Sequence, residues 1–203
     1  MHDTSKGRPD HLRLFQIAAG QHGHFTSAQA RACGFGTDLL THHVGSGRFA
    51  RVFRGVYRLR DYPTAPYDEV AAAWLAIGRD AVVSHESALA LLDLSDVVPD
   101  AIHLTVPRSR RYLPSISGVR LHTSSYPFHP GDLIEREGIK LTNPQRTIVD
   151  AAGAGTSPEQ IEMAIRQAIR RGLVLPESLR DSAVSRGQRV ARLVNQALEQ
   201  VVG

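Results

Sequence analysis

The sequence has few of the features that mark membrane or secreted proteins. No apolar run approaches the roughly 18 to 20 residues that cross a bilayer. The polar N-terminus, MHDTSKGRPDH, also lacks the apolar segment of a signal peptide. The chain has one cysteine, Cys33, which excludes an intramolecular disulfide and favours a reducing compartment. We therefore expect a cytoplasmic protein that does not cross a membrane.

The motifs of common nucleotide-using and nucleic-acid-cutting enzymes are missing as well. There is no G-x-x-x-x-G-K-[ST] phosphate loop, and no H-R-D or D-F-G element of a protein kinase. A nuclease needs carboxylates and a lysine around its metal ion. The chain has no lysine after Lys140, and after Asp150 its acids are scattered along helical segments. A metal-dependent nuclease domain is therefore not favoured.

Two histidine-containing pairs are candidates for a chemical site. Ser84 and His85 could suggest a nucleophile and its base, but neighbours at a helix start point in different directions, and Ser84 suits a helix cap. His42 and His43 could suggest a metal ligand pair, but adjacent helical residues lie about 100° apart around the axis. We predict no catalytic residue, no metal and no cofactor.

Positive charge is present, and it is unevenly distributed. Through residue 62 there are nine lysines and arginines against four acids, a net charge of +5. The remaining 15 bases and 16 acids give −1. A basic first third joined to a neutral remainder is typical of a nucleic-acid-binding domain attached to a second function.

The basic first third predicts three short helices. Residues 11–23 have apolar side chains near helical spacing and stop at glycines. The second helix opens with Thr26 and Gln29 as a capping box and closes at Gly34. The third helix begins with Thr37 as its expected N-cap, and its expected inward-facing residues are Leu39, Leu40 and Val44.

A basic ribbon follows the third helix. Two β-runs, 48–53 and 55–59, surround the dipeptide Arg54-Gly55 and mix arginines with strand-forming residues. Three helices followed by a two-stranded ribbon is the layout of a winged helix-turn-helix. This layout predicts that the third helix enters the DNA major groove and that the ribbon contacts phosphates or the minor groove. The predicted DNA-binding residues are Thr37, Thr41, His42, Ser46, Arg48, Arg51, Arg54, Arg58 and Arg60. The alternative is that the arginines only keep the edge of a small hairpin soluble.

The composition changes after residue 62, where Pro63 and Pro66 mark a boundary. We predict a DNA-binding domain over residues 1–62 and a second domain over residues 63–203, with helix 68–79 able to pack on either. The second domain combines a few short strands with a helical C-terminal block. The expected fold class is thus α+β, with an N-terminal winged helix-turn-helix.

Several stretches, taken in order, resemble the AbiEi-like antitoxins of bacterial type IV toxin–antitoxin systems. The stretches are GHFTSAQARACGF, GRFARVFRGVYRL, SHESALALLDL, IHLTVPRSRR, VRLHTSS and LTNPQRTIVDAAG, and the resemblance covers roughly residues 10–175. Its most specific parts are the ribbon R-V-x-R-G-V-Y, which begins at Arg51, and the helix start T-x-P-x-R-T-x-x-D, which runs from Thr142 to Asp150.

The resemblance implies two activities. The N-terminal domain would repress its own operon by binding inverted repeats in double-stranded DNA. The C-terminal domain would neutralise a cognate toxin that is a nucleotidyltransferase-like enzyme. Arg108, Arg110 and Arg111 form a basic loop without local acids, and we predict that they contact the toxin. Two alternatives stay open: a transcriptional regulator with a dimerisation or sensing domain, and an antitoxin that promotes covalent modification of its toxin, for example phosphorylation.

Overall fold

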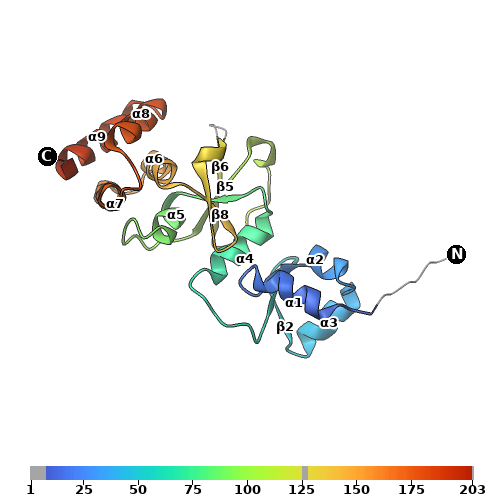
Figure 1. Ribbon diagram of the computed structural model, residues 1–203. Coiled ribbons are helices and arrows are strands. Elements are labelled where there is room, and N and C mark those ends of the chain that lie inside the picture. Colours follow the sequence, from blue (N-terminus) through green and yellow to red (C-terminus); the bar gives the residue numbers. More distant parts are fainter. Residues whose placement is uncertain (1–7, 125–127, 203) are drawn as a thin grey trace. The chain divides into compact units, whose positions relative to one another are not determined.

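The computed structural model describes residues 8–124 and 128–202, so the N-terminal segment on which the signal-peptide prediction rests lies mostly outside the described residues (Figure 1). The chain forms two compact units. Unit 1 holds the residues up to Arg79 together with Glu137–Ile139, and unit 2 holds Asp80–Arg136 and the residues from Lys140 onward. Within the described residues, no helix is both long and apolar enough to span a bilayer.

Unit 1 is a winged helix-turn-helix followed by one further helix. Its strands pair antiparallel in the order β1-β3-β2, so β3 of the ribbon is the central strand of a three-stranded sheet and β2 is an edge strand. The sequence missed β1 because three residues between two helices carry too little periodicity to be recognised. The elements are α1 (His11–Ala19), β1 (His24–Thr26), α2 (Ser27–Ala32), α3 (Thr37–Gly45), β2 (Phe49–Phe53), β3 (Val56–Leu59) and α4 (Asp68–Ile77).

The predicted helix boundaries in unit 1 hold, with one exception. The Thr26 hydroxyl accepts a hydrogen bond from the Gln29 amide, and the Gln29 side chain accepts one from the Thr26 amide, which completes the capping box. Gly34 follows α2 with a positive φ of 83°, as expected for a helix-ending glycine. The prediction of Thr37 as N-cap is wrong, because Gly36 occupies that position and Thr37 is the first residue of α3.

The core of unit 1 is aromatic. Phe25, Phe35 and Phe49 are buried, and the Phe25 and Phe49 rings meet edge to face with centroids 5.0 Å apart. Helix α4 buries most of its alanine-rich sequence and contacts all three strands of this sheet. The predicted boundary at residue 62 therefore falls inside unit 1, and α4 belongs with the winged helix.

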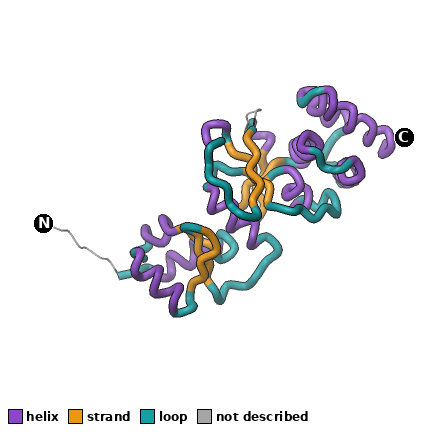
Figure 2. Tube along the Cα trace, turned by 180° about the vertical axis from the view of Figure 1, so that it is seen from behind, coloured by secondary structure: helices purple, strands orange, loops and turns teal. Residues whose placement is uncertain are grey.

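Unit 2 is built on a mixed five-stranded sheet in the order β6-β5-β4-β8-β7. Strand β5 pairs parallel with β6 and antiparallel with β4, whereas β4 pairs parallel with β8. Figure 2 shows the last helices gathered together beyond the strands. The elements are β4 (Val82–Val83), α5 (His85–Leu91), β5 (Ile102–Val106), the 3-10 turn η1 (Arg108–Arg110), β6 (Val119–Thr123), the 3-10 turn η2 (Pro130–Asp132), β7 (Leu133–Arg136), β8 (Ile139–Thr142), α6 (Pro144–Ala154), α7 (Pro158–Arg170), α8 (Pro176–Ser185) and α9 (Gln188–Val202).

Two predicted helix starts in unit 2 are confirmed. Asn143 caps α6 by accepting from the Arg146 amide at 2.7 Å, with Pro144 in the first helical position. Ser157 caps α7 in the same way by accepting from the Gln160 amide at 3.5 Å. These starts place α6 directly after β8, so that residues of its first two turns lie near the ends of the central strands. The α+β fold class predicted from the sequence is confirmed.

Candidate functional site

Helix α3 presents a polar face to solvent. Thr37, Thr41, His42 and Ser46 are exposed, as a helix that reads DNA requires. The neighbouring His43 is buried instead, where its ring lies 4.8 Å from the Phe49 ring and burial lowers its pKa. The two adjacent histidines therefore lie in different surroundings.

The ribbon carries arginines that extend from the sheet. Arg51 and Arg54 are exposed in β2 and in the turn that follows it, and Arg48 and Arg60 are exposed at the base of the ribbon. Gly55 takes a positive φ of 77° at the turn, which allows the chain to reverse there. In the part of the chain that the structure describes, these four arginines form no ion pair with an acid. Their charge is thus available to a polyanion.

Arg58 differs from the other predicted DNA-binding arginines. Its guanidinium donates to the carbonyl oxygens of Leu59, Tyr62 and Pro63 and forms an ion pair with Asp68 at 3.0 Å. Both side chains of the pair are about 15% exposed. The sequence could not separate Arg58 from its neighbours, because its acidic partner lies ten residues away at the start of α4. We assign Arg58 to holding the ribbon against α4 and leave it out of the proposed DNA interface.

The predicted basic loop of unit 2 is partly paired. Arg108 and Arg111 are exposed, and Arg111 lies over the Tyr112 ring at 4.4 Å from its centroid. Arg110 forms an ion pair with Asp80 at 3.6 Å, which is an acid far away in sequence. The loop therefore presents two arginines and an 82% exposed tyrosine to solvent.

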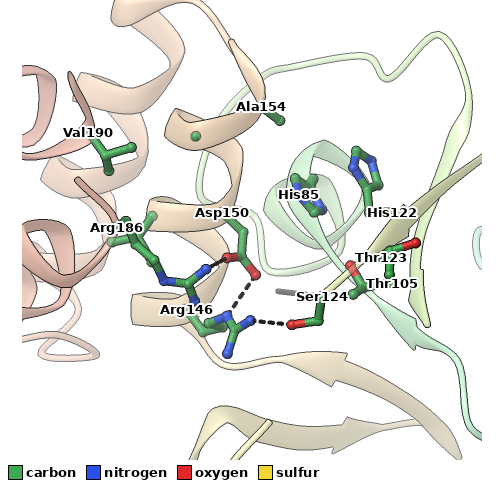
Figure 3. Close-up of a pocket in the computed structure, with 12 residues that line it drawn as sticks. His85, Thr105, His122, Thr123, Ser124, Arg146, Asp150, Ala154, Arg186 and Val190 are labelled. Atoms are coloured by element: carbon green, nitrogen blue, oxygen red, sulfur yellow. Dashed lines mark hydrogen bonds and ion pairs between the residues drawn. The ribbon is translucent and has the colours of Figure 1, made fainter. Parts of the chain in front are cut away.

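The helix-start motif of α6 builds a buried ionic group. The Arg146 Nε donates to Asp150 at 2.8 Å, and its terminal nitrogens donate to Asp132 at 3.1 Å and to Ser124 at 3.2 Å. Arg186, which follows α8, contacts the other Asp150 oxygen at 2.8 Å. Burial raises the pKa of Asp150, whereas the two guanidinium groups oppose that shift. Asp150 thus holds two arginines from separate elements in fixed positions (Figure 3).

Three histidines gather beside this group. The His85 and His122 rings stack with centroids 3.7 Å apart, and His122 Nε2 lies 3.3 Å from His103 Nδ1. Burial is the main cause that lowers the pKa of His85 to about 2 and that of His122 to about 4. All three imidazoles are therefore expected to be neutral at pH 7, because burial also lowers the pKa of His103.

Ser84 does not act as the helix cap expected from the sequence. It occupies the N-cap position of α5 but makes no capping bond. Its hydroxyl lies 2.8 Å from His85 Nδ1 and 2.7 Å from the Thr105 hydroxyl, so the expectation that Ser84 and His85 point apart is wrong. Ser84 is fully buried, and it orients His85 rather than facing solvent.

These side chains surround a pocket of about 320 Å³ in unit 2. The sequence did not predict it because its residues come from five segments that are far apart in the chain. The one available signal is strand register, since β5 and β6 pair Thr105 with His122. The lining residues are His85, Thr105, His122, Thr123, Ser124, Arg146, Val149, Asp150, Gly153, Ala154, Arg186 and Val190.

Comparison with known proteins supports the predicted resemblance for part of the chain. Residues 12–60 match a family model described as "Transcriptional regulator, AbiEi antitoxin". The fold is similar to that in the crystal structure of the RV2827C protein from Mycobacterium tuberculosis, with 17% sequence identity and a TM-score of 0.62. That similarity covers 93% of this chain and 75% of the other, and at this identity it concerns the fold alone. No curated protein matches the chain significantly.

Proposed function

We propose that the protein is a DNA-binding antitoxin of a type IV toxin–antitoxin system, which represses its own operon and neutralises a nucleotidyltransferase-like toxin. The observation that carries the proposal is the winged helix-turn-helix, whose residues 12–60 match the antitoxin regulator family. The exposed arginines of its ribbon, which lack acidic partners among the described residues, support DNA as the ligand.

The geometry suggests different DNA contacts for helix α3 and for the ribbon. Helix α3 would lie in the major groove, where Thr41 and His42 reach base edges. Arg51 and Arg54 would neutralise phosphates or enter the adjacent minor groove. Two copies on inverted repeats would place two such helices on successive half-sites, as the symmetry of an operator demands.

The proposed toxin-neutralising activity is assigned to residues 63–203, of which α4 packs in unit 1 and most of the remainder forms unit 2. A nucleotidyltransferase holds its metal ions with carboxylates, so the surface near its active site is acidic. The exposed Arg108 and Arg111 would attract such a surface and orient the encounter. Arg110 contributes less in this assignment, because Asp80 already pairs with it.

A plain transcriptional regulator is the second candidate, and the pocket in unit 2 favours it. A volume of about 320 Å³ lies at the lower end of small-molecule sites, as a sensing domain requires. A toxin gene beside this one would favour the antitoxin. An antitoxin that promotes modification of its toxin would be distinguished by transfer of labelled phosphate to the toxin.

The experiment that tests the proposal is co-expression in a bacterial host. The full chain should restore growth to cells that express the cognate toxin and should lower the activity of a reporter placed behind its own promoter. Growth restored without repression would favour neutralisation alone, and repression without growth would favour the plain regulator. If the full chain neither restores growth nor lowers reporter activity, the proposal is contradicted.

A further inference from the structure

The pocket of unit 2 has no part in the proposed contact with DNA. Its polar side chains come from α5, β5, β6, α6 and the residue that follows α8, and they are held by one another (Figure 3). Two arginines, one carboxylate, two imidazoles and three hydroxyls line one space, and such a lining suits a polar ligand. All of these residues belong to unit 2, and the site is independent of the proposed function.

A metal ion is the first ligand to weigh. His85, His103 and His122 each offer a nitrogen, and these atoms lie within 4.8 Å of one another. A metal ion must lie in the plane of each imidazole that binds it. The rings of His85 and His122 are nearly parallel, 15° apart, and stacked face to face, so their planes have no shared position near both nitrogens. The arrangement therefore disfavours a common metal.

The charges around the pocket favour an anion instead. Arg146 and Arg186 line it with Asp150 as the one carboxylate, which leaves a formal charge of +1 while the histidines are neutral. Asp132 also pairs with Arg146 but lines a neighbouring pocket. Arg146 and Arg186 both act to lower the pKa of His85, in the same direction as burial. The positive charge near His85 therefore comes from these two guanidinium groups, which attract anions.

The pocket also supplies hydrogen-bond donors. Thr105, Thr123 and Ser124 contribute hydroxyl groups, and the Ser124 hydroxyl accepts from Arg146. His85 Nδ1 contacts the Ser84 hydroxyl, so Nε2 is the nitrogen that His85 can offer to a ligand. His122 Nε2 lies 3.3 Å from His103 Nδ1, so Nδ1 is the nitrogen with which His122 can donate to a ligand. Asp150 fixes both guanidinium groups before any ligand arrives, which reduces the ordering that binding would require.

We propose that this pocket binds the phosphate group of a small ligand, with Arg186, His122 and Ser124 as direct donors and Asp150 as a positioning residue. Guanidinium groups and hydroxyls match phosphate oxygens in geometry and charge. The ligand is either free inorganic phosphate or a nucleotide whose phosphate enters the pocket. The volume of about 320 Å³ exceeds what a phosphate group alone needs, which favours a nucleotide.

The proposal is tested by calorimetric titration of the full chain with inorganic phosphate and, separately, with a nucleoside triphosphate free of metal ions. Imidazole signals in NMR spectra should shift for His85 and His122 as the ligand is added. Arg186→Gln and His122→Asn should each weaken binding by about tenfold or more, since each removes a donor to a charged oxygen. Arg120→Gln is the matched control. Arg120 lies on β6, as His122 does, but it does not line the pocket, and it pairs with the exposed Asp100.

Each outcome decides for or against the site. Tighter binding of the nucleotide identifies it as the source of the phosphate, whereas equal binding identifies free phosphate. The proposal is overturned if wild-type protein binds neither probe, or if Arg120→Gln weakens binding as much as Arg186→Gln. It is also overturned if Zn²⁺ shifts the imidazole signals and phosphate does not. Circular dichroism of each variant separates lost binding from lost folding, and the wild-type NMR titration needs no variant.

Discussion

At the scale of single residues, Arg54 and Arg58 show how neighbours of one type take different roles. Arg54 is exposed in the turn of the ribbon, whereas Arg58 is bound to Asp68 and to three carbonyl groups. A side chain with its donors already engaged would have to break those bonds to reach a phosphate. The exposed arginines are thus the expected DNA contacts, and Arg58 is the expected support.

The first prediction separates these roles. Arg51→Ala and Arg54→Ala should each weaken binding to the protein's own promoter and lower the salt dependence of log K by about 1. Their unfolding midpoints should hardly change, because both side chains are exposed. Fluorescence anisotropy over a range of salt concentrations measures both quantities. Arg192→Ala, an exposed arginine of unit 2, should leave both unchanged.

Arg58→Ala should behave in the opposite way. It removes the partner of the mostly buried Asp68 and should lower the free energy of unfolding by about 2 kcal/mol, as urea denaturation measures it. The salt dependence of its DNA binding should match that of the wild type. A stable Arg58→Ala protein with a lowered salt slope would show that this guanidinium does contact DNA.

The second prediction concerns the stability of unit 2 at acid pH. The pKa values of His85 and His122 are lowered to about 2 and about 4, below the 6.5 of an unfolded histidine. Between these values the unfolded chain binds protons that the folded chain does not, so stability falls as the pH drops below about 6.5. At pH 5 the two histidines together should cost about 4 kcal/mol relative to pH 7.

Urea denaturation at pH 7 and pH 5 measures this difference. Burial also lowers the pKa of His103, which adds to the loss, whereas the raised pKa of Asp150 acts in the opposite direction. His122→Asn should reduce the difference between the two pH values, and replacement of the exposed His42 by Asn should not. Equal stability of the wild type at both pH values would refute the assignment of neutral, buried imidazoles.

At the scale of elements, local sequence signals predicted helix ends well, but they did not predict which residues far apart in the sequence come into contact. The capping residues Thr26 and Asn143 were predictable because each acts on an amide only three residues away. The pocket was not, because His85 and His122 lie 37 residues apart in the sequence and meet only when β6 joins β5. The pairing of Arg58 with Asp68 was likewise invisible, since no local pattern marks which arginine of a basic strand turns inward.

The third prediction compares two of these caps. The Asn143 side chain accepts from the Arg146 amide at 2.7 Å and also donates to the Gly131 carbonyl at 2.6 Å. The Ser157 cap is exposed, and its bond measures 3.5 Å. Asn143→Ala should therefore lower the free energy of unfolding by about 1 to 2 kcal/mol, and Ser157→Ala by about 0.5 kcal/mol. Thermal or urea unfolding measures the two losses in stability. A larger loss for Ser157→Ala than for Asn143→Ala would show that bond length and burial do not control cap strength here.

At the scale of the whole molecule, the excess of positive charge lies in one of the two units. The excess of basic residues lies before residue 62, within the winged helix of unit 1, whereas unit 2 carries the mixed sheet and the late helices. This division favours two separable activities in one chain. It also favours tests in the full-length protein, because Glu137–Ile139 belongs to unit 1 and a simple truncation would remove it.

The last prediction separates the two activities without truncation. Arg108→Glu with Arg111→Glu reverses the exposed charge of the loop after β5 and leaves Arg110 paired with Asp80. Repulsion from an acidic toxin surface should abolish growth rescue, while operator binding by the winged helix should stay at the wild-type level. Arg51→Ala with Arg54→Ala should do the reverse, with rescue kept and repression lost. If the loop variant folds and still protects cells fully, the loop is ordinary surface, and the toxin contact must be sought on the C-terminal helices.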